Sequence, residues 1–207
     1  MTSLAARCRF LLAGFATTAL LAAPSPAIAA SAPADATGCP ATPVAQPFAA
    51  WNDMSDYFLA PDGGLEQGGA GWTTRAGAAV VAGSEPFAVL APSDRKSMRL
   101  PAGSAATTAP FCIRAEDRTM RFFANAPAAG SLRVEVLYTD ARGIDRTMPI
   151  GNVAGSGAWA PSPVLPMVVN DLAADRGNAM SIRLRFAPHG FAAWSIDDVH
   201  VDPYRVK

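Results

Sequence analysis

Few side chains in this 207-residue sequence can act as general bases near neutral pH. Only its two histidines have an ordinary pKa suited to that role. His189 lies between Pro188 and Gly190, which is typical of a turn, and His200 alternates with apolar neighbours, as a half-buried strand residue does. Neither stands in a Gly-x-Ser-x-Gly or His-x-x-x-His pattern. The sequence therefore predicts no nucleophilic or metal-hydrolase site.

Carboxylates offer a second chemistry, because two of them at the right separation hydrolyse glycosidic bonds. That separation belongs to the folded chain, and no motif marks a pair in this sequence. A small hydrolase is therefore the weakest of three functional hypotheses. Its candidate residues are the glutamates Glu66, Glu85, Glu116 and Glu135.

Tryptophans are a third kind of candidate, because the C–H face of a sugar stacks on aromatic rings. Trp159 and Trp51 lie in predicted loops and are the candidate ligand-stacking residues. Trp72 and Trp194 lie within predicted strands, so we expect them in the core. The alternative for the two loop tryptophans is partial burial in a structural role.

Of the three cysteines, Cys8 lies in the predicted leader described below, which leaves Cys39 and Cys112. In an exported chain this pair is expected to form a disulfide. Two alternatives stay open. The pair can be two buried free thiols, or Cys39 can carry a lipid anchor, because residues 36–39 loosely resemble the sequence before a lipidated cysteine.

The N-terminus has the pattern of a secretory signal peptide. Arg7 and Arg9 precede an apolar run at residues 10–23, and small residues then lead to a cleavage site after Ala29 or Ala30. Residues 1–29 are therefore predicted to be removed, and the mature protein is predicted to be secreted.

A membrane anchor is the rival interpretation of this leader. The apolar run is shorter than the roughly 20 residues that a bilayer crossing needs, and Pro24 and Pro26 close it. No later segment of the sequence is suited to span a membrane. Residues 30–47, rich in Ala, Pro and Thr, are predicted to be a mobile lead-in, and residues 48–207 a single domain.

Charge argues against a nucleic-acid partner. Without Arg7 and Arg9 the chain keeps 15 basic residues against 17 acidic ones, a formal net charge of −2. The arginines are scattered along the sequence and form no basic stripe.

Alternation with a period of two dominates the sequence after residue 48. Leu132, Val134 and Val136 share one face, while Arg133 and Glu135 share the other. This pattern is typical of a sheet with one solvated face.

Residues 180–187 alternate in the same way, with Arg183 and Arg185 facing outward. The clearest predicted strands are 119–125, 132–140, 144–153, 180–187 and 193–202, and weaker ones are 72–76, 78–82, 97–100 and 107–113. Single helical turns fit residues 45–57 and 169–176. The predicted fold class is all-β, a two-sheet antiparallel β-sandwich.

Two segments resemble a known family. Gly63-Gly64-Leu65-Glu66-Gln67-Gly68 is followed by Gly71-Trp72, and Trp194-Ser195-Ile196-Asp197-Asp198-Val199 lies near the C-terminus. They are similar to the two ends of a galactose-binding-like jelly roll, the fold of many carbohydrate-binding modules and some adhesion domains. The resemblance implies a jelly-roll sandwich in which a strand after Gly64 lies beside the strand at residues 194–202.

The same resemblance implies a structural calcium ion. In the jelly-roll modules an early Glu and a late Asp commonly hold Ca²⁺, which corresponds here to Glu66 and Asp198, or Asp197 if the register differs by one. Carboxylate and carbonyl oxygens are the ligands that Ca²⁺ prefers. Leu65 departs from the aromatic residue usual before the Glu. The alternative is that these acids are solvated charges.

Five segments form a broader pattern: Asp56-Tyr57-Phe58-Leu59, Gly83-Ser84-Glu85-Pro86-Phe87, Arg121-Phe122-Phe123, Arg183-Leu184-Arg185-Phe186 and Asp197-Asp198-Val199-His200-Val201-Asp202-Pro203-Tyr204. This pattern covers residues 57–205 and resembles a family of uncharacterised secreted bacterial proteins, a resemblance that implies no activity. We expect a secreted, non-catalytic binding domain whose ligand is a glycan or a cell-envelope component. The first alternative is a structural or adhesion protein that acts by protein contact. A glycan binder should present an aromatic ring beside polar side chains on a concave face, and an adhesion module a large apolar patch.

Overall fold

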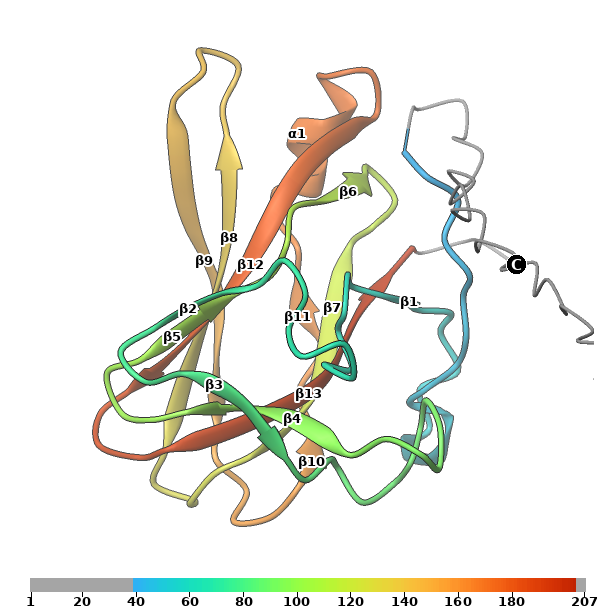
Figure 1. Cartoon of the computed structure of the whole chain (residues 1–207). Coiled ribbons are helices and arrows are strands. Elements are labelled where there is room, and N and C mark those ends of the chain that lie inside the picture. The colour runs from blue at the N-terminus through green and yellow to red at the C-terminus, as the bar shows by residue number, and fades with distance from the viewer. Residues whose placement is uncertain (1–38, 204–207) are drawn as a thin grey trace, which may run out of the picture. The chain divides into compact units, whose positions relative to one another are not determined.

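The computed structural model describes residues 39–203, so the predicted leader at residues 1–29 lies outside the described residues. The described chain forms two antiparallel sheets (Figure 1). The first sheet has seven strands: β1 (Phe58–Leu59), β3 (Ala79–Ala82), β4 (Lys96–Leu100), β7 (Thr119–Asn125), β10 (Ala160–Pro161), β11 (Leu165–Pro166) and β13 (Trp194–Asp202). Its order is β10-β7-β13-β4-β3, with β1 against β13 and β11 against β7.

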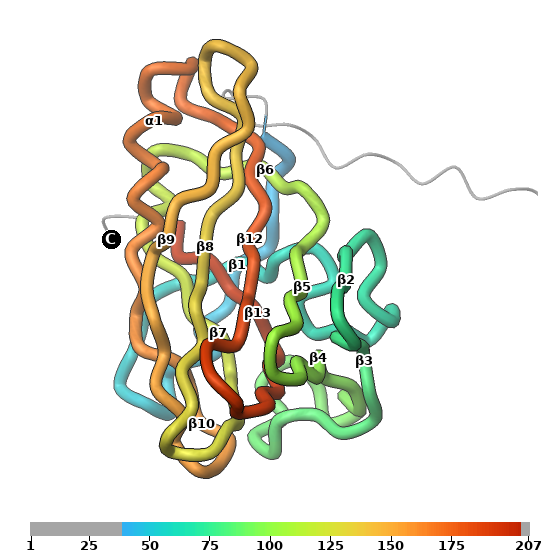
Figure 2. Tube along the Cα trace, turned by 90° about the vertical axis from the view of Figure 1, so that its left-hand side faces the viewer, coloured from blue at the N-terminus to red at the C-terminus, as the bar shows by residue number. Residues whose placement is uncertain are grey.

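The second sheet has six strands: β2 (Thr73–Arg75), β5 (Ala105–Thr107), β6 (Phe111–Arg114), β8 (Ser131–Thr139), β9 (Asp145–Ala154) and β12 (Ala179–His189). Its order is β2-β5-β12-β8-β9, with β6 against β12. Figure 2 looks onto this sheet, with β9, β8, β12, β5 and β2 side by side. Two single helical turns, η1 (Ala49–Trp51) and α1 (Asn170–Ala174), complete the described elements.

The predicted fold class is confirmed. The five clearest predicted strands correspond to β7, β8, β9, β12 and β13, with ends that differ by at most two residues. The helical turns η1 and α1 fall within the two segments predicted to hold them. The chain therefore forms the expected two-sheet antiparallel β-sandwich.

The core lies between the two sheets. Apolar side chains of β8 and β12 meet those of β7 and β13, as the period-two pattern predicts. Phe122 of β7 packs edge-to-face against Phe186 of β12, with ring centroids 5.1 Å apart. The opposite faces of β8 and β12 carry Arg133 and Arg183, which are exposed.

The strand predicted at residues 107–113 is wrong in one respect, because the chain there forms two strands. Both β5 and β6 pair with β12, but Thr107 lies opposite Arg185 and Phe111 opposite Ile182, a register shift of one residue. Pro110 interrupts the ladder because it has no N–H to donate. The Thr108 hydroxyl accepts a hydrogen bond of 3.0 Å from the Leu184 N–H at this irregularity.

The strand predicted after Gly64 is also wrong, because residues 61–71 form turns. The chain that lies against β13 precedes Gly64: β1 pairs with it, and the Val199 N–H donates to the Gly63 carbonyl at 3.1 Å. A Cβ on Gly63 would lie 2.7 Å from the Val199 carbonyl oxygen, so this contact requires glycine. The resemblance thus placed the right segments together but in a different backbone conformation.

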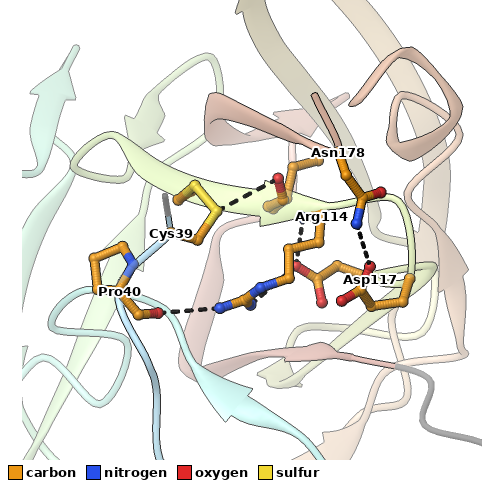
Figure 3. The surroundings of a disulfide bond; sticks show 8 residues. Cys39, Pro40, Arg114, Asp117 and Asn178 are labelled. Carbon is orange, nitrogen blue, oxygen red and sulfur yellow. Dashed lines mark hydrogen bonds and ion pairs between the residues drawn. A yellow bond between two sulfur atoms is a disulfide. The ribbon is translucent and has the colours of Figure 1, made fainter. Parts of the chain in front are cut away.

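A disulfide joins Cys39 to Cys112 of β6, with the two Cα atoms 5.6 Å apart, and the predicted pairing is confirmed (Figure 3). Beside it, Nη2 of Arg114 donates to the Pro40 carbonyl at 3.1 Å, which fastens the same segment to β6. Further along, Ala45 and Tyr57 exchange two backbone hydrogen bonds of 2.9 and 2.8 Å. Within residues 39–203, no helix is long and apolar enough to cross a membrane.

Candidate functional site

A hollow lies on the outer face of the six-stranded sheet, over β2, β5, β12 and β8. It has a volume of about 680 Å³, within the range of roughly 300–1,000 Å³ that is common for ligand sites. The strands run side by side beneath it (Figure 2). We call this hollow the groove.

The strand registers place two small side chains between two long ones in one row across the sheet. Arg75 lies opposite Ala105, and Arg133 lies opposite Ala187. Because β5 and β12 are neighbours, the two small alanine side chains lie between the two long arginines. All four residues line the groove, with alanines as its floor and arginines as its walls.

The adjacent row carries an ion pair. Thr73, Thr107, Arg185 and Glu135 follow one another across β2, β5, β12 and β8. Nε and Nη2 of Arg185 both lie 2.6 Å from Oε2 of Glu135. Glu135 is the only acidic residue among those that line the groove, and it forms this ion pair with Arg185.

Three other arginines of the groove have no side-chain partner within residues 39–203. They are Arg75, Arg133 and Arg183, and all three are exposed. The groove therefore concentrates positive charge on one face of a nearly neutral chain.

A second hollow of about 370 Å³ continues the groove along β12 and β8, because the two hollows share Leu137 and Arg183. Arg176 and Tyr138 also line it, and it has no acidic lining residue. Nη1 of Arg176 donates to the Thr139 carbonyl at 2.8 Å. Together the two hollows run along the strands of this face.

The predicted calcium residues lie on the other sheet. Asp197 and Asp198 are buried where β13 has a bulge, and Asp198 has a left-handed backbone conformation with φ of 49°. Asp197 Oδ2 accepts hydrogen bonds from the Ser84 hydroxyl at 2.9 Å and the Glu85 N–H at 3.1 Å. These contacts tie the loop after β3 to β13.

Burial raises the pKa of both aspartates. Desolvation is the largest cause for Asp197, whose pKa rises to about 7, with the Glu85 charge as a smaller one. The pKa of Asp198 rises to about 9, through desolvation and then the charges of Asp197 and Glu85. Oδ2 of Asp198 is buried and has no hydrogen-bond partner.

Glu66 lies near this cluster, but its side chain is hydrogen-bonded to the backbone at the start of β4. Its Oε1 accepts from the backbone N–H groups of Arg95 at 2.7 Å and Lys96 at 2.8 Å. The Lys96 ammonium donates to the Glu66 carbonyl at 2.7 Å. Among residues 39–203, no three His, Cys, Asp or Glu side chains are placed so that they could share a metal ion.

The two candidate stacking tryptophans pack around one small aromatic cluster, formed by Phe48, Tyr57 and Phe123. Trp51 lies edge-to-face with Phe123 at 5.2 Å and is half-buried. It also borders a hollow of about 540 Å³ with Phe87, which is 41% exposed. Trp159 is half-buried against the same cluster.

The other singled-out residues are placed as follows. Trp194 is buried in the core, as predicted. Trp72 precedes β2 and is half-buried, packed against the edge of the core rather than within it. His189 is exposed and lines the groove. His200 is fully buried rather than half-buried, and desolvation lowers its pKa to about 4, so it is neutral at physiological pH.

The groove was not predicted from the sequence. Alternation correctly predicted that Arg133, Arg183 and Arg185 face outward, and these three arginines line the groove. It gave no strand order, so the approach of β2 and β5 to β12 was not visible. Phe191, in the turn after β12, was missed as well, and it is 101% exposed.

Comparisons with known proteins place the chain near carbohydrate-binding modules in structure only. No protein-family model matches it, and no curated protein is similar to it. The structure of TmCBM61 in complex with β-1,4-galactotriose is 14% identical, with 72% of this chain and 98% of that chain covered and a TM-score of 0.45. The tandem CBM22 domain of Paenibacillus barcinonensis Xyn10C is 15% identical, with 72% and 44% covered and a TM-score of 0.47.

A third similar structure is the family 11 carbohydrate-binding module of Clostridium thermocellum, in complex with a β-1,3-1,4-mixed-linked tetrasaccharide. It is 12% identical, with 70% of this chain and 95% of that chain covered and a TM-score of 0.43. The active domain of a bacteriophage CBA120 tailspike protein is also similar, at 13% identity, with 70% of this chain and 21% of that chain covered and a TM-score of 0.45.

Proposed function

We propose that this protein is a secreted, non-catalytic carbohydrate-binding domain whose ligand lies in the groove of the six-stranded sheet. The observation that carries the proposal is the extended polar hollow over β2, β5, β12 and β8. An elongated groove of this kind fits a chain-like polar ligand. The Cys39–Cys112 disulfide supports export, because such bonds persist in oxidising compartments.

No Phe, Tyr or Trp lines the groove, so it lacks the aromatic ring expected of a glycan binder, and its contacts to a sugar would be hydrogen bonds to the hydroxyls. Thr73 and Thr107 present hydroxyls from neighbouring strands, and the arginines present N–H donors. These side chains stand on a hydrogen-bonded sheet rather than on long loops. The site is therefore largely preorganised, which lowers the entropic cost of binding.

A binding role fits the groove better than hydrolysis. Glycosidases need two carboxyl groups beside the scissile bond. Glu135 is the only carboxylate among the groove-lining residues, and Arg185 holds it in an ion pair. Asp197 and Asp198 are close to each other but buried under the loop after β3.

We propose Trp51 as a second sugar contact, separate from the groove. It borders a hollow whose other walls include Pro47, Ala50 and Phe87. A half-buried tryptophan beside such a hollow is suited to stack on a sugar where a face of its ring is accessible. Trp159 is the weaker of the two candidates, because it borders none of the hollows described above.

We also propose that a calcium ion binds at the Asp197–Asp198 cluster. Its support is the unpartnered, buried Oδ2 of Asp198 and the negative charge that surrounds it. A Ca²⁺ ion would neutralise that charge. Glu66 and Asp197 already accept hydrogen bonds, so Asp198 and nearby backbone carbonyls are the groups with most freedom to bind an ion.

Binding to a panel of soluble neutral and acidic polysaccharides, measured by affinity electrophoresis and calorimetry, tests the proposed function. We expect at least one polysaccharide to bind, and Ala187→Phe to abolish that binding by filling the groove floor. Trp51→Ala is the matched variant at the other surface. No binding to any polysaccharide, or loss of binding with Trp51→Ala and not with Ala187→Phe, would contradict a ligand site in the groove.

A further inference from the structure

We propose that the groove selects an acidic glycan, a polysaccharide whose sugar units carry carboxylates. This inference rests on the proposed function and adds the chemical class of the ligand. Its basis is the unmatched positive charge that the strand order gathers over an alanine floor. Neither the scattered arginines of the sequence nor the near-neutral net charge shows this feature.

The charges that line the two hollows are strongly one-sided. Arg75, Arg133, Arg183 and Arg185 line the groove, and Glu135 is its one acid. Arg185 and Glu135 neutralise each other at 2.6 Å, which leaves three arginines without an anion. The second hollow adds Arg176 and no acid.

The positions of the three arginines suit repeated anionic groups. Arg75 and Arg133 face each other across the two alanines, about 14 Å apart at the backbone, because three strand spacings separate them. Arg183 lies four residues from Ala187 along β12, or about 13 Å. A polymer that carries a carboxylate on successive units can therefore meet more than one guanidinium as it crosses the face.

Arginine favours carboxylate as the anion. Its planar guanidinium donates two parallel hydrogen bonds to the two oxygens of a carboxylate, a geometry that selects for this group. The alanine floor leaves room for a sugar ring between the walls. The exposed His189 lines the same groove and offers ring nitrogens for further hydrogen bonds.

A nucleic acid is a less suitable polyanion for this surface. Single-stranded nucleic acids are held by aromatic rings on which the bases stack. The larger hollow is lined by no Phe, Tyr or Trp, and Tyr138 is the only such residue that lines the smaller hollow. Three unmatched arginines are also few beside the roughly six to ten phosphate contacts of a salt-sensitive DNA-binding protein.

The test compares polygalacturonate with the same polymer after its carboxyl groups have been reduced to alcohols. We expect the acidic polymer to bind and the reduced polymer to bind at least tenfold more weakly. Raising the salt concentration should weaken only the first interaction. Equal binding of both polymers would overturn the acidic selectivity and leave glycan binding intact, whereas binding of neither would count against both proposals.

Variants of the groove arginines locate the selectivity. Arg133→Gln and Arg183→Gln should each weaken polygalacturonate binding about fivefold to tenfold, because each removes one charge-assisted contact. Arg99→Gln, an exposed arginine of β4 on the other sheet, is the matched control and should bind as the unchanged protein does. Equal losses in all three variants, or equal binding of a single-stranded DNA of similar charge, would overturn the proposal.

Discussion

At the scale of single residues, Asp198 stands out because its surroundings disfavour the ionised form of its carboxyl group. It is 1% exposed, one carboxylate oxygen has no partner, and Asp197 and Glu85 lie close by. Such a group either keeps its proton or gains a cation. The two outcomes predict different behaviour in solution.

The first prediction concerns pH in the absence of metal. The Asp198 carboxyl has an ordinary pKa of 3.8 and a folded-state pKa of about 9, so between these values the folded chain holds more protons. The free energy of unfolding should therefore fall as the pH rises from about 7 to 9. Asp197 adds to this fall only up to its pKa of about 7, and His200 acts in the opposite sense only below its ordinary 6.5.

Melting temperatures measured in chelator across that range check this prediction. Asp198→Asn cannot ionise, so its melting temperature should depend less on pH than that of the unchanged protein. The exposed Asp175→Asn serves as the control and should keep the original slope. A pH dependence that is the same in all three proteins would contradict the raised pKa.

The second prediction concerns calcium. If Asp198 contributes to a calcium site, added Ca²⁺ should raise the melting temperature, and chelator should lower it, because the ion binds the folded state alone. The rise should be larger at about pH 8 than at about pH 5, because protons compete with the ion for Asp198 and this competition weakens as the pH approaches the pKa of about 9. Asp198→Asn should remove the response. A melting temperature that ignores Ca²⁺ in the unchanged protein would exclude the site.

At the scale of elements, what the sequence could predict was limited to local patterns. Alternation over residues 132–138 and 180–187 fixed the faces of β8 and β12, because the side-chain period of a strand is local. The groove depends on β2 pairing with β5 and β5 with β12, and no local pattern encodes these pairings. The hydrogen bonds of Glu66 were equally hidden, because the chain around it forms turns rather than a strand.

The third prediction tests how the segment before Gly64 contacts β13. Gly63→Ala should lower the free energy of unfolding by about 1–3 kcal/mol, because the new Cβ meets backbone: the Val199 oxygen at 2.7 Å and the Ala60 oxygen at 3.0 Å. Gly64→Ala is the control, since its new Cβ would meet side-chain atoms rather than backbone: the end of Leu90 at 2.7 Å and Oδ1 of Asp198 at 3.1 Å. Urea denaturation measures both variants, and an equal cost for the two would contradict the described contact.

At the scale of the whole described domain, the two sheets have different roles. The seven-stranded sheet holds the buried Asp197 and Asp198, whereas the six-stranded sheet carries both the disulfide and the groove. The disulfide fastens residue 39 to β6, next to β12 and outside the row of arginines. Its contribution to stability should therefore be separable from ligand binding.

The fourth prediction follows from that separation. The Cys39–Cys112 bond closes a loop with a sequence separation of 73 residues, which on the chain-entropy model stabilises the folded state by about 4 kcal/mol. The double variant Cys39→Ser, Cys112→Ser should lose roughly that free energy of unfolding in urea, because its unfolded chain regains the loop entropy. Its polysaccharide affinity should stay unchanged at temperatures where it is folded, since Thr73, Thr107 and the arginines keep their strands. A loss of affinity in the folded double variant would show instead that the bond positions β6 and β12 for binding, and a stability change below about 1 kcal/mol would show that the loop is already constrained without it.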